Sequence, residues 1–299
     1  MPDAKPPISS APAASSLPEI QTLNDAHYGE VLTFLAARSV DTIFMSGLIR
    51  DNGLVSEFNR GTFYGCRDAQ GQLEGVALVG HATLIETRSE GALAAFAHLA
   101  KEAQAHVIVG DQEKVEHFWS HYERGGQQPL RICRELFLEQ RWPVDTLTEA
   151  AALRLATMDD LEALVSVNAR MACDESGTNP LEHDAAGFRA RLARRIELGR
   201  VWVWTGEDGR LLFKADIMAE VPGCIYLEGV YVHPDERRRG YGRRAVSQLG
   251  RFLLARTETL CLLVNEQNKD AQVFYFKAGY KLRACYDTIF LQPKAGESN

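Results

Sequence analysis

The chain has no long hydrophobic run, no paired cysteine motif and no excess of positive charge. No apolar segment approaches the roughly 20 residues that a membrane-spanning helix needs, so the sequence predicts no membrane segment. The formal net charge of −7 argues against nucleic-acid binding by overall electrostatic attraction. With 299 residues, 45% of them hydrophobic and 24% charged, the chain has the composition of a globular protein and the length of two ordinary domains.

The cysteines also exclude a disulfide framework. They are scattered, form no Cys-x-x-Cys pair and lie mostly in apolar runs, which is typical of reduced core cysteines in a cytoplasmic protein: Cys66, Cys133, Cys173, Cys224, Cys261 and Cys285. Residues 1–17 are rich in Pro, Ala and Ser and lack the apolar core of a signal peptide. We therefore expect a disordered lead-in there, in place of a secretory signal.

The most informative segment is Arg-Arg-Arg-Gly-Tyr-Gly-Arg-Arg at residues 237–244. It follows a strand-like run at 225–232 and a turn at 233–236, and it opens an amphipathic helix. Two glycines at a helix start leave several backbone N–H groups free to point at one spot, where the helix dipole and the arginines add positive charge. This pattern predicts a binding site for a polyanion, most simply a pyrophosphate.

This segment has two other interpretations. A single Gly-x-Gly can be an ordinary turn, and a run of arginines can be a solvated face. Gly240-x-Gly242-x-x-Ala245 also fits the dinucleotide fingerprint, which requires glycines directly after a strand and a second nucleotide-binding half. Here at least five residues intervene, and the next strand-like run, 259–264, is followed by Asn265 where an acid is needed. The dinucleotide interpretation is therefore rejected.

Two motifs resemble the GNAT superfamily of N-acetyltransferases. Arg237-x-x-Gly240-x-Gly242 is similar to its acyl-CoA signature, (Gln/Arg)-x-x-Gly-x-(Gly/Ala). Residues 268–280 are similar to its late helix, Asn-x-x-Ala-x-x-x-Tyr-x-x-x-Gly-(Phe/Tyr). The resemblance covers residues 151–291. It implies an α/β (α+β) fold, a mixed, mostly antiparallel sheet flanked by helices, with acetyl-CoA as co-substrate and no metal.

The expected elements repeat in the two halves of the chain. The second half is expected to contain strands at 151–155, 201–205, 211–219, 225–232, 259–264 and 281–291, and helices at 161–171, 185–196 and 268–278, with a capping box at Thr157–Asp160. The first half is expected to contain helices at 26–38, 91–105 and 113–122, and strands at 62–66, 73–78, 106–109 and 130–138. We therefore expect two tandem GNAT-like domains.

The predicted domain at 18–140 is a degenerate GNAT-like domain, 141–150 is a linker, and 151–299 is the acyl-CoA-binding domain. In the first domain, Gly110–Lys114 is the expected equivalent of the glycine loop. That segment has two acids, no second glycine and no arginine cluster. Because acids repel phosphate, we expect no cofactor in this domain.

The resemblance also implies site residues. Backbone N–H groups of the loop would anchor the pyrophosphate: Arg237, Arg238, Arg239, Gly240, Tyr241, Gly242 and Arg243. The exposed backbone of Val230, Tyr231 and Val232 would pair with pantetheine, and an N–H near Val230 would stabilise the oxyanion. Asn268 would cap the last helix and approach the pantetheine arm. Tyr275 would protonate the leaving thiolate, unless it is only a core tyrosine.

Several acids are candidates for proton transfer or acceptor binding. Glu228 shares a face with Val230 and Val232 by strand alternation, and burial would raise its pKa toward that of a base. It could instead be solvated or paired with Lys214. Glu175, placed in a loop after the first helix, and Asp216 on the preceding strand are candidates for acceptor binding. Transfer through water, without one base, stays open.

Three histidines carry weaker signals. His117 and His121 lie four residues apart on a helix and could share a metal. With no third ligand in view, a surface or core role is favoured, and no metal site is predicted. His233 precedes Pro234 in a turn and is expected to have no catalytic role.

The sequence thus predicts a cytoplasmic, acetyl-CoA-dependent N-acetyltransferase that moves the acetyl group directly to a primary amine. Its partner would be a small-molecule or peptide amine, with neither nucleic acid nor membrane involved. A non-catalytic acyl-CoA sensor and a transferase of a longer acyl group are the alternatives. The acceptor is not named by the sequence, although the acidic net charge favours a cationic one.

Overall fold

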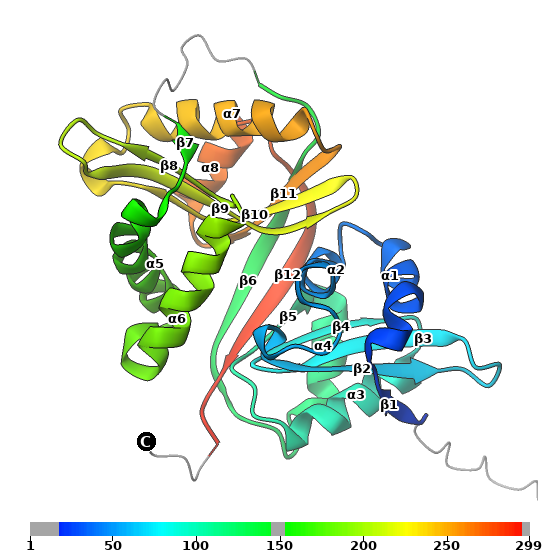
Figure 1. Ribbon diagram of the computed structural model, residues 1–299. Helices are drawn as coiled ribbons and strands as arrows, with labels where there is room; N and C mark the ends of the chain where they lie inside the picture. Colours follow the sequence, from blue (N-terminus) through cyan, green and yellow to red (C-terminus); the bar gives the residue numbers. More distant parts are fainter. Residues whose placement is uncertain (1–17, 145–152, 295–299) are drawn as a thin grey trace, which may run out of the picture.

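The computed structural model describes residues 18–144 and 153–294. The predicted lead-in at 1–17 and most of the predicted linker therefore lie outside the described residues. Within them, the strands form one continuous sheet of twelve, in the order β1-β2-β3-β4-β5-β12-β6-β11-β10-β9-β8-β7 (Figure 1). The expected α/β class with a mixed, mostly antiparallel sheet is confirmed, since only β4–β5 and β10–β11 run parallel.

The N-terminal half contributes ten of the main elements in the described residues. They are β1 (Ile20–Thr22), α1 (Tyr28–Ala36), α2 (Ile43–Asn52), β2 (Gly61–Arg67), β3 (Leu73–Gly80), β4 (Ala82–Thr87), α3 (Glu90–Glu102), β5 (Val107–Asp111), α4 (Gln112–Tyr122) and β6 (Pro129–Gln140).

The C-terminal half repeats this order. Its elements are β7 (Arg154–Leu155), α5 (Leu161–Ser176), α6 (Pro180–Glu197), β8 (Val201–Thr205), β9 (Leu211–Val221), β10 (Cys224–Val232), α7 (Tyr241–Leu254), β11 (Thr259–Asn265), α8 (Lys269–Lys277) and β12 (Lys281–Leu291). The capping box is confirmed, because the Thr157 N–H donates to Asp160 Oδ2 at 2.8 Å.

Some elements differ from expectation. The elements β1, α2 and β4 were not predicted. Helix α5 runs on to Ser176, where Gly177 ends it with φ +78°. Helix α6 begins at Pro180 but breaks at Asp184, whose side chain accepts the Gly187 N–H at 2.9 Å. The second part of α6 is thus the predicted helix, with Asp184 as its cap.

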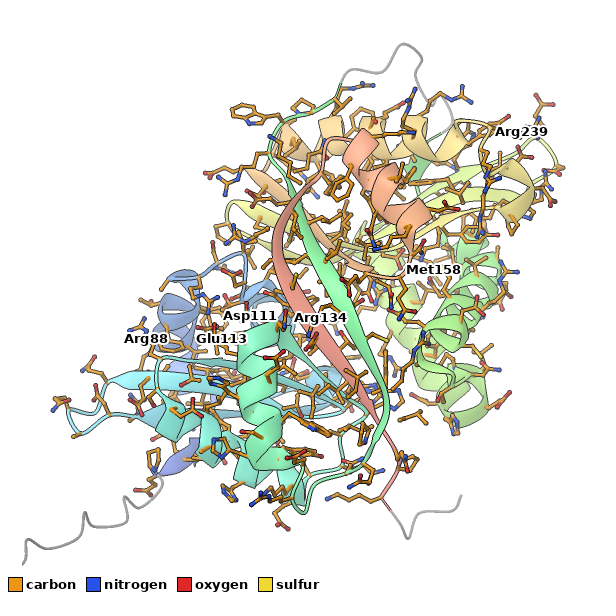
Figure 2. The ribbon with its side chains drawn as sticks, turned by 180° about the vertical axis from the view of Figure 1, so that it is seen from behind. Arg88, Asp111, Glu113, Arg134, Met158 and Arg239 are labelled. Carbon is orange, nitrogen blue, oxygen red and sulfur yellow. The ribbon has the colours of Figure 1, made fainter. Side chains whose placement is uncertain are left out.

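The two halves exchange their last strands. Strand β6, from the N-terminal half, lies between β11 and β12, and β12, from the C-terminal half, lies between β5 and β6. Figure 1 shows both strands crossing the middle of the molecule between the two groups of helices. Arg134 of β6 and Asp287 of β12 form an ion pair at 2.9 Å across this junction, and Figure 2 shows Arg134 where the strands cross.

Helices cover both faces of the sheet in each half. In the C-terminal half, α7 and α8 cover one face and α5 and α6 the other, each over its own apolar cluster. In the N-terminal half, α3 and α4 lie opposite α1 and α2. Helix α2 also packs across the junction on β9 so closely that a Cβ on Gly47 would lie 2.5 Å from the Ala219 Cβ. Phe44 of this helix meets Tyr226 of β10 edge-on at 4.4 Å.

No helix within 18–144 or 153–294 combines the length and apolarity needed to cross a membrane.

The strand exchange makes a prediction about the separated halves. A C-terminal fragment that starts at Asp145 lacks β6, so β11 and β12 lose their shared neighbour and expose unpaired edges. We expect this fragment to be insoluble or to unfold without a cooperative transition in circular dichroism, whereas co-expression with residues 1–144 restores a soluble complex. A C-terminal fragment that melts cooperatively on its own would contradict the dependence on β6.

Candidate active site

The parallel strands β10 and β11 separate partway along their length. They pair from Cys224–Thr259 to Tyr226–Cys261, and no pair follows. From Leu227 to Val232, the edge of β10 that faces β11 therefore has no strand partner in the described residues. A free strand edge presents backbone N–H and C=O groups that an extended ligand can pair with. This edge ends at the arginine- and glycine-rich loop.

A β-bulge in β10 corrects one sequence prediction. Glu228 pairs with Asp216 and Tyr231 pairs with Lys214, so Gly229 and Val230 together oppose one residue of β9. Gly229 has φ +60°, and a Cβ there would lie 2.7 Å from Lys214 Nζ. Because the bulge resets the alternation, Val230 packs toward α7 and α8, while Glu228 lies near charged groups of β9, α5 and α6. The expected shared face of Glu228 with Val230 and Val232 is wrong.

Tyr231 contributes backbone to the free edge but not its side chain. The ring is 5% exposed and packs in the cluster beneath α5 and α6. Its hydroxyl accepts a hydrogen bond from Arg170 at 3.1 Å. The side chains of Val230 and Val232 pack against the opposite core.

The loop before α7 has the geometry of an anion site. Gly240 has φ +83° and stands at the N-cap position of α7, and Arg238 also has a left-handed φ, +63°. The Arg237 Nε donates to the Val232 carbonyl at 3.3 Å, which ties the loop to the end of β10. Helix α7 thus begins with uncapped N–H groups and no acid in its first turn, where an anion is favoured.

The arginine side chains of the loop point in several directions. Arg239 bonds Glu236 at 2.8 Å, and Figure 2 shows it at the outer edge of the C-terminal half. Arg238 lies 3.8 Å from Asp270 with both side chains almost fully exposed. Arg243 is exposed and forms no ion pair within the described residues. The guanidinium of Arg244 lies over the rings of Tyr241 and Trp204, at 4.9 and 5.5 Å.

Gly242 lets helix α7 approach β10 closely. A Cβ at this position would lie 2.7 Å from Val232 Cγ2 and 3.1 Å from the Phe274 ring. The glycine is therefore required by packing, and its closeness fixes the start of α7 beside the free edge of β10.

Helix α8 supplies two of the predicted residues. Asn268 caps it, accepting the Ala271 N–H at 3.1 Å. Tyr275 lines the cleft between the separated strands, is 8% exposed, and its hydroxyl forms no hydrogen bond within the described residues. Burial raises its pKa well above the usual value, so the phenol is protonated and can donate.

The free edge of β10 opens into a cleft of about 1620 Å³ that both halves line. Three glutamates converge on it: Glu228 of β10, Glu175 of α5 and Glu135 of β6. Each raises the pKa of at least one of the others by charge repulsion, in addition to the larger effect of burial. Glu135 also accepts a hydrogen bond from the Thr288 hydroxyl of β12.

Glu228 is the most perturbed of the three. Its side chain is exposed to the open cleft, although protein atoms of the cleft walls surround it at a greater distance. Loss of solvation, followed by repulsion from Glu175, raises its pKa from 4.5 to about 7, although Arg195 and Lys214 act in the opposite direction. No hydrogen bond or ion pair holds it within the described residues. A carboxylate near pKa 7 is suited to take a proton at neutral pH.

Lys214, the alternative partner for Glu228, binds other residues. Lys214 is fully buried, and its Nζ donates to Asn168 and, at 2.9 Å, to Asp216 Oδ2. Arg195 donates to the same oxygen at 3.1 Å. Asp216, the acceptor-binding candidate, is thus 3% exposed and held by two cations, which suits a structural ion pair better than contact with an acceptor.

The second acceptor candidate, Glu175, lies in the last turn of α5, so its expected place in a loop is wrong. Its carbonyl accepts a hydrogen bond from Arg131 of β6 at 2.7 Å. Neither Arg131 nor Glu135 could be assigned to the site from sequence, because only the strand exchange brings β6 to the cleft. The sequence carries no distinct signal for Glu135, because β6 also contains Arg131, Arg134 and Glu139.

The topology also corrects the comparison of the two halves. The parallel pair β4–β5 makes β4 the counterpart of β10 and α3 the counterpart of α7. The segment that corresponds to the glycine loop is therefore Arg88–Ser89, before α3, and not Gly110–Lys114. Aligning the first parallel pairs, Ala82–Val107 with Cys224–Thr259, places Glu86 where Glu228 lies in the other half.

Glu86 has a different environment from Glu228. Its carboxylate bonds Arg38 at 3.3 Å and also bonds Lys114, and Glu86 is 6% exposed. Two cations therefore fill the space beside Glu86. The corresponding space beside Glu228 in the C-terminal half opens into the cleft.

The histidines on α4 bind an acid. His117 Nδ1 lies 3.3 Å and His121 Nε2 3.0 Å from the two oxygens of Glu90. No group of three or more metal-ligand side chains occurs in the two described stretches. The His233 ring accepts the Asp235 N–H at 3.3 Å in its turn.

Comparison with known proteins agrees with this geometry. Residues 214–289 match the model of the FR47-like protein family. No curated protein sequence matches the chain. Among solved structures, a Drosophila protein aligns with TM-score 0.67 at 13% identity, over 93% of this chain and all of its own.

Two further structures are GNAT proteins by name. A tandem GNAT protein from the clavulanic acid biosynthesis pathway aligns with TM-score 0.58 at 12% identity, over 94% of this chain and 99% of its own. An acetyltransferase of the GNAT family from Colwellia psychrerythraea aligns with TM-score 0.57 at 13% identity, over 92% and 100%. The chain therefore has the tandem GNAT fold, with an FR47-like region in its C-terminal half.

Proposed function

We propose that the protein is an acetyl-CoA-dependent N-acetyltransferase that acts on a primary amine. The observation that carries the proposal is the free edge of β10, which leads from Glu228 to the glycine loop at the start of α7. An extended pantetheine arm fits such an edge, and a pyrophosphate fits the uncapped helix start. The missing Cβ of Gly242 leaves α7 close enough to β10 for one ligand to contact both.

Each step of acetyl transfer to an amine has a residue in this cleft. Glu228 would take a proton from the acceptor's ammonium, so that the neutral amine can attack the thioester carbonyl, because its pKa of about 7 lets it do so near neutral pH. The Val230 N–H, in the bulge of β10, would donate to the developing oxyanion. Tyr275, protonated and without a hydrogen-bond partner among the described residues, would give its proton to the departing thiolate.

The surrounding residues position these groups. Arg131 holds the end of α5, and with it Glu175, beside the cleft. Glu175 and Glu135 add negative charge near Glu228, which favours an ammonium as the incoming group. The acceptor's amine would thus be bound as a cation before it loses a proton.

The first prediction concerns Glu228. A base works only when deprotonated, so kcat/KM for amine acetylation should rise with pH through about 7 and fall away below it. Glu228→Gln should remove this rise and lower kcat by about 10²-fold or more. Glu258→Gln, an exposed acid outside the cleft, is the matched control. An unchanged pH profile in Glu228→Gln would exclude this residue as the base.

The second prediction concerns Tyr275. Tyr275→Phe keeps the ring and removes only a hydroxyl without a described partner, so stability and acetyl-CoA affinity should change little. Turnover should fall by about 10²-fold or more. Tyr280→Phe is the matched control, because that buried ring packs 5.6 Å from Tyr275 but does not line the cleft. If Tyr275→Phe turned over as fast as Tyr280→Phe and the wild type, Tyr275 would have no role in the mechanism.

The third prediction concerns the loop. Gly242→Asp places a Cβ 2.7 Å from Val232 Cγ2 and a negative charge at the proposed pyrophosphate site, so CoA binding measured by calorimetry should be lost. Gly29→Asp is the control, because nothing lies within 4 Å of a Cβ at that helical position. Intact binding by a folded Gly242→Asp variant would refute the phosphate-loop assignment.

A further inference from the structure

The cleft continues beyond the glutamates into a region lined by cationic and imidazole side chains from both halves. They are Arg60, His81, His106, His183 and Arg191. The first three come from the N-terminal half, and the last two from α6. No sequence pattern joins them, because they lie in four separate segments of the chain.

Arg60, His81 and His106 form one unit through their backbones. The His81 N–H donates to the Arg60 carbonyl, and the His106 N–H donates to the His81 carbonyl, both at 2.8 Å. The two imidazole rings stack with centroids 4.9 Å apart and planes 8° from parallel. Strands β4 and β5 begin directly after these histidines, so the parallel pair Ala82–Val107 fixes their relative position.

The positive charge of this region is not balanced within the described residues. Asp184 is its one acid, and its carboxylate binds Arg191 and the Gly187 N–H, both at 2.9 Å. The Arg60 guanidinium forms no hydrogen bond or ion pair with any described residue. The side chain is exposed to the cleft; partial burial, followed by repulsion from Arg191, lowers its pKa, although Asp184 acts in the opposite direction. A guanidinium in this situation gains from any anion that enters the cleft.

The histidines supply hydrogen-bond donors without adding charge. Burial, followed by the nearby Arg60, lowers the pKa of His81 to about 3, and the same two causes lower the pKa of His106. Both rings are therefore neutral at physiological pH, and each retains one N–H. An oxyanion beside Arg60 would thus meet a charged fork and neutral donors.

The distance between this region and Glu135 can be estimated along strand β12, which contacts both. The Thr288 hydroxyl bonds Glu135, and the Leu291 N–H donates to the His106 carbonyl at 2.9 Å. Thr288 and Leu291 lie three positions apart on an extended strand, a backbone span of about 10 Å. The residue that bonds Glu135 and the residue that bonds the His106 backbone are therefore about 10 Å apart along β12.

We propose that Arg60, together with His81 and His106, binds an oxyanion of the acceptor, a carboxylate or a phosphate, while the amine that is acetylated lies at the glutamate end of the same cleft. This proposal rests on the proposed function and names its substrate class. The span along β12 is that of about three residues of extended peptide. An α-amino acid, whose carboxylate is next to its amine, is too short to reach both ends. The N-terminal half then serves to recognise the far end of the acceptor.

Turnover tests the proposal directly. Thiol release from acetyl-CoA is followed with three series of increasing chain length: ω-amino carboxylates, aminoalkyl phosphates and uncharged alkylamines. We expect kcat/KM to be at least 10-fold higher for the long anionic amines than for alkylamines of equal length, with α-amino acids no better than alkylamines. Whichever anionic series is preferred identifies the oxyanion.

Variants of Arg60 assign this preference to the site. Arg60→Gln should abolish the preference and leave kcat/KM for alkylamines unchanged, whereas Arg60→Lys should keep part of it. Arg124→Gln, which removes an exposed arginine outside the cleft, should behave like the wild type. Turnover of alkylamines with no preference for anionic amines would overturn this proposal and leave the proposed function intact.

A binding measurement decides the matter if no amine is turned over. The ring C–H resonances of His81 and His106 in the full chain, assigned with His81→Gln and His106→Gln, are followed by NMR during titration with inorganic phosphate and with 6-aminohexanoate. Saturable shifts that disappear in Arg60→Gln would support the oxyanion site even if the enzyme proposal fails. Resonances that do not move with either probe would overturn it.

Discussion

The structure depends on the exchange of the last strands between the two halves. Strand β6 pairs with β12 along almost its whole length and with β11 over residues 135–140, and β12 pairs with β5 and β6. Each half thus completes the sheet of the other, and apolar side chains on both strands, such as Phe137 and Tyr286, pack together at 4.7 Å. This pairing also brings Arg131, Glu135 and Thr288 to the cleft, so the candidate site is built jointly by the two halves.

The sequence predicts the parts of the fold that depend on local patterns. Strands β8 and β12 were expected at their observed bounds, and the cap of α8 at Asn268 and the capping box at Thr157 follow from the side chains that accept backbone N–H groups there. Helix α2 is not predicted because its apolar residues divide between two clusters, Met45 and Ile49 in its own half and Ile43 at the junction, so they form no single stripe. Its Gly47 is required by contact with β9 and not by a turn. Such contacts join residues far apart in the chain, so the local hydrophobic periodicity of the sequence does not predict them.

The same limit applies to the site. The glycine loop could be located because its chemistry lies in one short segment. The face of Glu228 was predicted wrongly because simple alternation does not anticipate the bulge at Gly229. The roles of Lys214 and Asp216 as a buried ion pair, and the entry of β6 residues, depend on packing between elements. The boundaries of the two domains stay a prediction, and the strand exchange means that neither half has a complete sheet of its own.

The same strand position carries a glutamate in both halves, but the two glutamates have different electrostatic environments. Glu86 and Glu228 occupy matching positions on β4 and β10. Arg38 and Lys114 neutralise Glu86, whereas Glu228 faces other carboxylates in an open cleft and has a raised pKa. The difference comes from the neighbours and not from the strand. It accounts for the placement of the proposed chemistry in the C-terminal half, while the N-terminal half contributes Glu135 and the cationic end of the cleft.

A crystal structure of the full chain with acetyl-CoA tests this account most directly. We expect one cofactor per chain, with the pyrophosphate at the start of α7, the pantetheine along the free edge of β10 and the thioester between Glu228 and Tyr275. A cofactor bound between β4 and β5 in the N-terminal half, or a thioester remote from Glu228, would contradict it.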